Sequence, residues 1–321
     1  MRKFRWFVIV FIPVLLFSQP RPVATYSIVA LDEETGQLGV AVQSHWFSVG
    51  SVVPWAGAGV GAVATQSFVK VDYGPEGLSM MAHGLTSEEA LNRMLDTDPA
   101  AEVRQVAMIS ANGDVAAHTG ENCIQAAGHQ TGKNYSVQAN LMENATVWPA
   151  MAKAYENAEG DLADRMLAAL EAAEAEGGDI RGKQSAAMLI VSGNPTGIPW
   201  KDVVLDLRIE DHPDPLDELE RLIRIHRAYQ HANQGDVYVE KGETELALIE
   251  YDKAAQLYPE NPELPYWTAV TLADVGRLDE ALPMFKVAFA VDERWRTLTP
   301  RLVKSGLLPD DKAMMKKILA Q

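Results

Sequence analysis

The stretch Ala24-Thr-Tyr-Ser-Ile-Val-Ala-Leu-Asp-Glu-Glu-Thr-Gly-Gln-Leu-Gly-Val-Ala-Val-Gln-Ser44 decides how this chain folds. Two apolar runs flank a charged tip that contains Gly36, and this pattern predicts a β-hairpin. Both strands are too apolar to lie on an open surface, so we expect the hairpin to belong to a sheet that is covered on both faces.

The residues before the hairpin have the form of an export signal. Three basic residues among the first five precede an apolar run over 6–17 that is too short to span a bilayer. We expect residues 1–24 to be a signal peptide. The mature protein is then periplasmic or secreted, with no membrane association after the signal is removed.

The cleavage position determines what chemistry the first strand can perform. Ala24 suits the last position before a cut, although Pro22 is an unfavourable neighbour, and a cut after Ser18 followed by trimming is the alternative. A cut after Ala24 makes Thr25 the first residue. Its hydroxyl is then a nucleophile, and its free α-amine, which titrates near neutrality, is a base. The alternative is that Thr25 is only a β-branched residue that begins a strand.

Composition excludes some function classes. The 321-residue chain has a net charge of −16, which leaves no basic excess to bind nucleic acid. Its single cysteine, Cys123, cannot form an intramolecular disulfide, and we interpret it as a small buried residue. The histidines show no metal-binding spacing, so we expect no metal and no cofactor.

Further elements follow from local patterns. Asn112-Gly113 predicts a hairpin turn within residues 104–119. We expect strands at 59–66, 135–138, 185–191 and 203–209, and helices at 74–83, 86–95, 146–176 (interrupted near 160) and from Asp214 onward. Residues 46–58 are expected to form a loop that covers apolar surface.

The last third of the chain contains a repeat. Four residues recur after 34 positions: Gly242, Ala247, Tyr251 and Ala254 become Gly276, Ala281, Phe285 and Ala288. This is the period of the tetratricopeptide helical hairpin, and a generic helical bundle is the alternative. We expect residues 227–321 to form a helical repeat domain that leans on the preceding helix, with a concave surface for a protein partner.

Several polar residues are candidates to assist Thr25. Ser44 ends the second hairpin strand and is expected near Thr25, where it would contact the amine or itself act as nucleophile. Asn140 is a candidate oxyanion donor, or an ordinary turn residue. Ser27 points to the same side as Thr25, and we expect a neighbouring backbone group to satisfy its hydroxyl. Candidates to bind substrate are His45, Thr65, Gln66, Arg181 and Gln184.

Separated blocks of the sequence resemble one family, domain of unknown function 1028. They are 25–30, 39–44, 52–55, 59–66, 73–75, 181–187 and 211–215. The family is similar in fold to N-terminal nucleophile hydrolases. The resemblance therefore implies an α+β fold, a four-layer αββα sandwich over residues 25–226, and amide-bond hydrolysis. His45-Trp46 and Val69-Lys70-Val71 are less typical of the family and point to a changed substrate pocket.

The sequence thus supports an exported amidohydrolase that cleaves a small amide or peptide-like substrate with Thr25. The rival from another class is a non-catalytic scaffold whose helical repeats bind a protein partner. Exposed sheet edges and repeats also make a homo-oligomer an open alternative.

Overall fold

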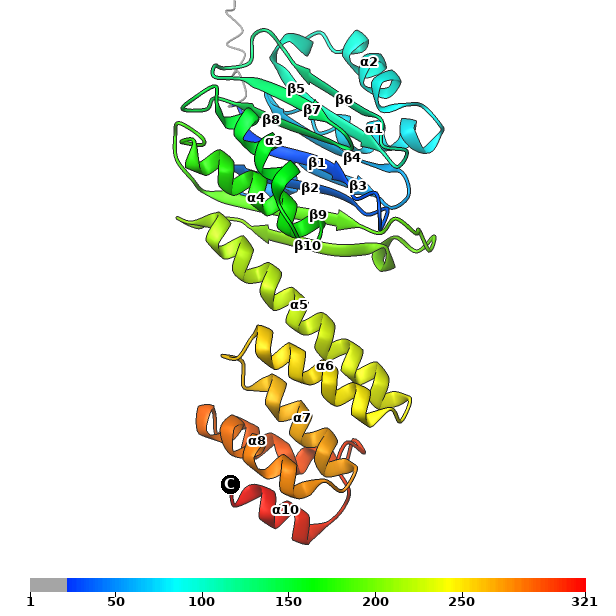
Figure 1. Cartoon of the computed structure of the whole chain (residues 1–321), viewed down its shortest axis with the longest axis vertical. Helices are drawn as coiled ribbons and strands as arrows, with labels where there is room; N and C mark the ends of the chain where they lie inside the picture. The colour runs from blue at the N-terminus through cyan, green and yellow to red at the C-terminus, as the bar shows by residue number, and fades with distance from the viewer. Residues whose placement is uncertain (1–21) are drawn as a thin grey trace, which may run out of the picture.

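The computed structural model describes residues 22–321, so most of the predicted signal peptide, residues 1–21, lies outside it. Within the described range, ten strands form two antiparallel sheets (Figure 1). The six-stranded sheet has the order β10-β9-β2-β1-β8-β7, and the four-stranded sheet has the order β3-β4-β5-β6. The strands are β1 (Thr25–Leu31), β2 (Leu38–Ser44), β3 (Pro54–Gly57), β4 (Gly61–Ser67), β5 (Arg104–Ser110), β6 (Val115–Thr119), β7 (Gly128–Gly132), β8 (Tyr135–Asn140), β9 (Ser185–Val191) and β10 (Val203–Ile209).

The predicted hairpin is the centre of the six-stranded sheet. β1 lies between β2 and β8, and its residues alternate between two cores. Ile28 packs with the helices on the outer face, whereas Val29 packs in the space between the two sheets. This period-two alternation places Thr25 and Ser27 on the same side as Val29, facing the four-stranded sheet.

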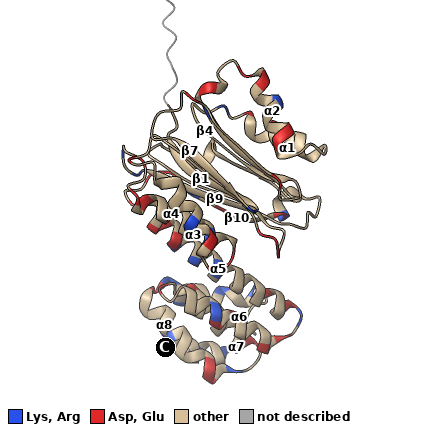
Figure 2. Cartoon of the chain, turned by 45° about the horizontal axis from the view of Figure 1, so that its top comes forward, with Lys and Arg blue, Asp and Glu red and all other residues tan. Residues whose placement is uncertain are grey.

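Helices cover the outer face of each sheet. α1 (Tyr73–Ala82) and α2 (Ser87–Thr97) pack on the four-stranded sheet, and α3 (Val147–Asn157) and α4 (Leu162–Ala175) pack on the six-stranded sheet. Charged side chains gather on the helices and loops, while the strands between them are almost without charge (Figure 2). This explains why the strand sequences are apolar on both faces.

Two strands, β3 and β7, were not predicted from the sequence, and both lie at sheet edges. Residues 46–58 contain the four-residue β3, which begins at Pro54, a residue tolerated only at a strand start or edge. β7 is an edge strand of the six-stranded sheet, and it is polar because its central residues are exposed there. An edge strand needs no apolar pattern on its solvent side, so neither gave a signal.

The C-terminal region consists of helices. They are α5 (Pro215–Glu240), α6 (Thr244–Leu257), α7 (Glu263–Asp274), α8 (Leu278–Val291), α9 (Arg294–Leu298) and α10 (Lys312–Leu319). Short 3-10 turns lie at η1 (Val49–Ser51), η2 (Ala101–Val103), η3 (Pro199–Lys201) and η4 (Thr299–Val303). Within residues 22–321 we find no helix that combines the length and apolar character needed to cross a membrane.

The longer helices of this region pack in consecutive pairs. α5 packs on α6, and α7 packs on α8. The recurring alanine and aromatic positions of α6 and α8 are all buried: Ala247, Tyr251, Ala254, Ala281, Phe285 and Ala288. α5 is 26 residues long, continues through the predicted domain boundary between 226 and 227, and packs against α6.

Asp98 is a buried ionic link between α2 and β5. It accepts from Arg104 Nε at 2.9 Å and from the Tyr73 hydroxyl at 3.2 Å. Burial raises the pKa of the Asp98 carboxyl, but hydrogen bonds from Arg104 and the Ala100 N–H outweigh it, so the pKa lies below its ordinary value.

Because folding lowers the pKa of Asp98, the free energy of unfolding depends on pH. The ion pair contributes fully above the unfolded-state pKa of about 3.9, and its contribution is lost as the pH falls through the lower folded-state pKa. We expect Asp98→Asn to destabilise the protein at pH 7, and the difference from the parent to shrink toward pH 3. Urea unfolding across this range measures it, and a constant difference would contradict the assignment.

Candidate active site around Thr25

The ends of four neighbouring strands, β1, β2, β8 and β9, lie side by side at one end of the six-stranded sheet. In the strand register, Thr25 lies opposite Ser44 on one side and Asn140 on the other, and Ser44 lies opposite Ser185. Because these strands are antiparallel neighbours, residues distant in sequence meet here. Two of the predicted catalytic residues, Ser44 and Asn140, are therefore the direct neighbours of Thr25.

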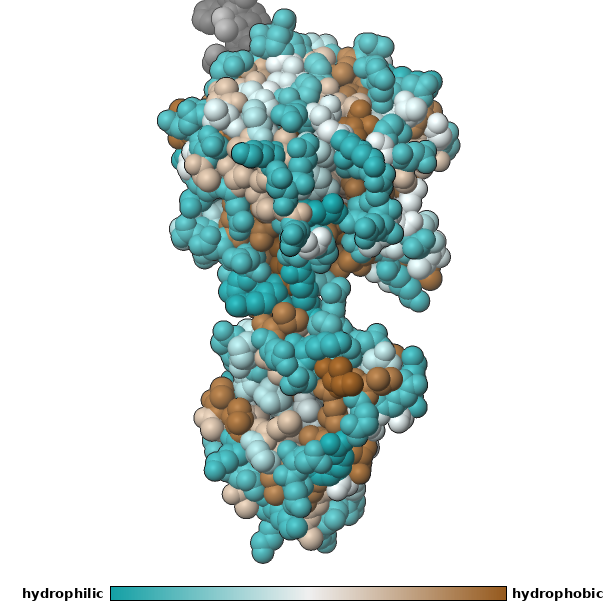
Figure 3. Space-filling view, viewed as in Figure 1, coloured by the Kyte–Doolittle hydropathy of each residue, from teal (hydrophilic) through white to brown (hydrophobic). Residues whose placement is uncertain are grey.

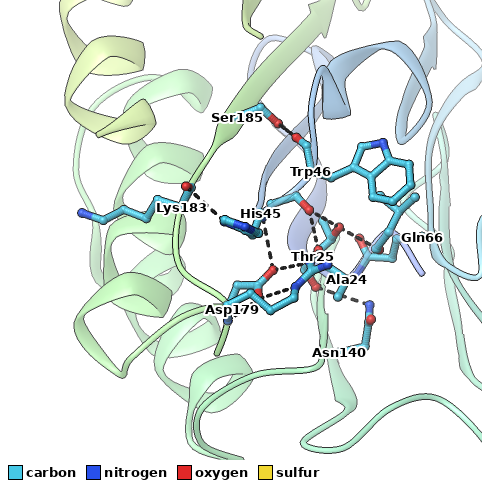
Figure 4. A network of polar contacts seen from close by, with 12 residues as sticks. Ala24, Thr25, His45, Trp46, Gln66, Asn140, Asp179, Lys183 and Ser185 are labelled. Atoms are coloured by element: carbon cyan, nitrogen blue, oxygen red, sulfur yellow. Dashed lines mark hydrogen bonds and ion pairs between the residues drawn. The ribbon is translucent and has the colours of Figure 1, made fainter. Parts of the chain in front are cut away.

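Thr25 itself is fully buried, and its hydroxyl lies within hydrogen-bond distance of other polar groups (Figure 4). The Oγ1 atom donates to the Val23 carbonyl at 2.9 Å and lies 3.1 Å from Ser44 Oγ. Its backbone nitrogen is here part of the peptide bond from Ala24. In the described chain Thr25 therefore follows residues 22–24 and has no free α-amine.

The carbonyl of Ala24 is held by two donors. Ser44 Oγ donates to it, and Arg181 Nη2 donates to it at 3.0 Å. A guanidinium and a hydroxyl that converge on one carbonyl oxygen would also stabilise negative charge on that oxygen. The peptide bond Ala24–Thr25 thus has an oxyanion-type environment with the Thr25 hydroxyl beside it.

Arg181 is oriented by Asp179. The carboxylate of Asp179 accepts from Arg181 Nε at 3.0 Å and from Nη2 at 2.7 Å, and it also accepts from the backbone N–H of His45 at 3.2 Å. The Asp179 side chain has no exposed surface. A bidentate pair fixes the plane of the guanidinium, so Arg181 is preorganised toward the Ala24 carbonyl.

A buried network of side-chain amides lies between the two sheets below Thr25. Gln66 and Asn140 donate to the Thr25 carbonyl at 3.2 and 3.4 Å. Both also donate to Gln105 Oε1, at 2.7 and 2.9 Å. Ser27 Oγ donates to Gln66 Oε1 at 2.6 Å and accepts from Gln138 at 2.6 Å. The Ser27 hydroxyl is therefore satisfied by side chains, which corrects the expectation of a backbone partner.

A cavity of about 540 Å³ adjoins the site. Its lining includes three of the residues predicted to bind substrate, namely His45, Arg181 and Gln184. Trp46, Phe47 and Leu141 give it apolar walls, and Pro22 also lines it. A cavity with apolar walls and a few convergent polar groups is typical of a small-ligand site.

Thr65 is the predicted substrate-binding residue that the fold does not bring to Thr25. It neighbours Gln66 on β4, and successive strand residues point to opposite faces. Its hydroxyl donates to the Lys70 carbonyl at 3.0 Å, away from the amide network. Gln184 lies at the mouth of the cavity, where it also donates to Asp211 at 3.1 Å.

Sequence reasoning missed three residues that organise the site: Asp179, Gln105 and Gln138. The two glutamines gave a usable signal, because each lies next to an apolar residue in its strand, and a polar residue that is buried there must find a partner. Asp179 gave a weaker signal: it lies in a loop two residues before Arg181, where the two opposite charges can pair. Its contact with the His45 backbone joins segments 134 residues apart.

Nearby titratable groups are kept in fixed states. A hydrogen bond to Asp214 raises the pKa of Lys183, which therefore stays a cation, and its Nζ points away from Thr25 (Figure 4). Burial and the neighbouring Glu174 raise the pKa of Tyr26, so its phenol stays neutral. Burial also raises the pKa of Cys123, whose thiol is a buried donor to Arg104 O, as a small core residue would be. Among residues 22–321, no group of three His, Cys, Asp or Glu side chains is placed to hold a metal ion.

Comparisons with known proteins show which family the chain resembles. The crystal structure of protein SPO2555 from Silicibacter pomeroyi, a DUF1028 protein, superposes with a TM-score of 0.57 at 31% identity, covering 63% of this chain and 85% of that chain. No curated protein matches. The family of unknown function DUF1028 matches residues 25–219, and the match begins at Thr25 itself. This chain therefore belongs to the family of unknown function DUF1028.

Proposed function

We propose that this protein is an exported amidohydrolase in which Thr25, freed as the first residue, is the nucleophile. One observation carries the proposal: the Thr25 hydroxyl lies 3.1 Å from Ser44 Oγ, and Ser44 and Arg181 both donate to the carbonyl oxygen of the adjoining residue, Ala24. Nucleophile and oxyanion donors are thus already assembled around an amide bond.

In the proposed reaction the Thr25 hydroxyl attacks the carbonyl carbon of a substrate amide, and the α-amine of Thr25 takes the hydroxyl proton. Arg181 and Ser44 stabilise the oxyanion, and the proton leaves with the substrate amine as an ester to Thr25 forms. Water then hydrolyses the ester and regenerates the hydroxyl. A nearby guanidinium favours the neutral amine, which is the form that acts as base.

The layered arrangement of the first domain supports this proposal. Helices, sheet, sheet and helices follow one another, with the candidate nucleophile at the start of a central strand. The proposal interprets these layers, over residues 25–226, as the four-layer αββα sandwich of N-terminal nucleophile hydrolases. Fold similarity alone does not assign a reaction, and the proposal therefore rests on the site.

The intact mass of the exported protein tests the first requirement. We expect the mature chain to begin at Thr25, because only then is its nitrogen an amine. An active mature protein that retains residues before Thr25 would contradict the mechanism, since an amide nitrogen is not a base. A cut after Ser18 without trimming is the specific alternative that this mass distinguishes.

A second candidate function is partner binding by the helical region, residues 227–321, which we propose to be tetratricopeptide-like. The observation that favours it is a groove of about 490 Å³ lined by Val239, Tyr251, Trp267, Val270 and Leu307 among others. Apolar side chains also gather on the surface of this region (Figure 3). Asp236, Glu240 and Asp274 rim the groove, which favours a segment with apolar and basic residues.

A further inference from the structure

The three residues before Thr25 are bound to the domain in the way that a peptide is bound by a protein. Val23 forms an antiparallel bridge with Ser67: its N–H donates to Ser67 O at 2.6 Å, and Ser67 N–H donates back to Val23 O at 3.0 Å. Such pairing of an extended segment with the end of a strand is a common mode of peptide recognition.

The side chains of this segment are also accommodated individually. Val23 is only 1% exposed and packs with the apolar residues between the two sheets. Ala24 has no exposed surface, so a larger side chain at that position has to displace its neighbours. Pro22, one residue earlier, lies against the 540 Å³ cavity.

We infer that residues 22–24 occupy the acyl-binding cleft of the enzyme, and that its substrate is an extended peptide with a small residue on the acyl side of the cleaved bond. This inference rests on the proposed function. In it, Ala24 takes the place of the residue that donates the scissile carbonyl, and Val23 takes the place of an apolar residue before it.

The same geometry predicts how the product is held. Cleavage after the small residue leaves a carboxylate where the Ala24 carbonyl now lies, within reach of Arg181 and Ser44. A guanidinium binds a carboxylate with charge-assisted hydrogen bonds that are stronger than those to a neutral carbonyl. A peptide that ends in Pro-Val-Ala is therefore a product analogue of the enzyme.

The test uses a chain that starts at residue 25, released from a removable fusion partner. It retains all the strands and helices described above. Position 25 carries Thr25→Ala, so that binding is measured without turnover. The probes are N-acetyl-Pro-Val-Ala and N-acetyl-Pro-Val-Phe, both with free carboxylates, and calorimetry measures the dissociation constants.

We expect the alanine probe to bind at least about tenfold more tightly than the phenylalanine probe, because the latter overfills the buried position. Arg181→Gln is expected to weaken the alanine probe by about 10- to 100-fold, the size of a charged hydrogen bond. The matched control is Arg221→Gln, since Arg221 pairs with Glu218 on the surface of α5, and it should leave binding unchanged.

The full chain with residues 22–24 in place supplies a second test that needs no change in the cleft. Its cleft is already filled, so the alanine probe should bind only to the shortened chain.

Equal binding of the two probes, equal binding to both chains, or no binding at millimolar concentration overturns the inference. Tight binding of the alanine probe by a Thr25 chain without hydrolysis of any peptide amide overturns the proposed function alone. Amide hydrolysis indifferent to residue size overturns only this inference.

Discussion

Replacing Thr25 by alanine is expected to lower amide hydrolysis by at least about 10³-fold, because the variant lacks the attacking oxygen. The assay substrate is the anilide of N-acetyl-Pro-Val-Ala, and release of the aniline is followed by absorbance. Arg181 and Ser44 remain in place in this variant, so some rate above that in water should persist.

Two companion variants separate the roles of the hydroxyl and the amine. Thr25→Ser keeps both groups and should retain a readily measured rate. A chain with one glycine added before Thr25 keeps the hydroxyl but converts the amine into an amide, so its rate should fall nearly as far as in the alanine variant. Full activity of the glycine-extended chain would show that another group acts as base, and full activity of Thr25→Ala would turn attention to Ser44.

The central hairpin and its neighbours were predictable because local pattern and burial agree there. Two apolar runs on either side of a charged tip predicted the hairpin within residues 24–44, and the strand register then brings Ser44 to Thr25. The same applies to the capping box at Thr86 and Glu89, which starts α2 where the sequence indicated.

The rest of the site depends on contacts across the two sheets, which a single sequence does not reveal. Gln66 on β4, Gln105 on β5 and Asn140 on β8 meet only because the sheets face each other with their polar ends aligned. Gln66 and Asn140 were singled out for their residue type, while Gln105, which joins them, was not. The length of α5 escaped prediction for a related reason: a helix that bridges two packed regions shows no break in its own pattern at the boundary.

Loss of the Gln105 side chain should destabilise the first domain strongly. It accepts from Gln66 and Asn140, and its own amide donates to Thr119 Oγ1 at 2.9 Å and to Ala139 O at 2.9 Å. Gln105→Leu leaves several buried groups without a partner, each of which costs about 1–3 kcal/mol. We expect the free energy of unfolding, measured with urea, to fall by about 3–5 kcal/mol.

Gln43 offers a matched control, because it is an equally buried glutamine of the same domain that lies on the outer, helix-covered face of the six-stranded sheet, opposite Tyr26 in the strand register. Neither of its side-chain amide atoms has a hydrogen-bond partner within residues 22–321. Its desolvation is therefore not offset in the folded state, and Gln43→Leu should be neutral or stabilising by up to about 2 kcal/mol. Opposite signs for the same substitution at two buried positions would show that the hydrogen-bond network, rather than glutamine burial as such, holds Thr25 in place. If Gln105→Leu proved as harmless as Gln43→Leu, Gln66 and Asn140 could not depend on Gln105 for their orientation toward the Thr25 carbonyl.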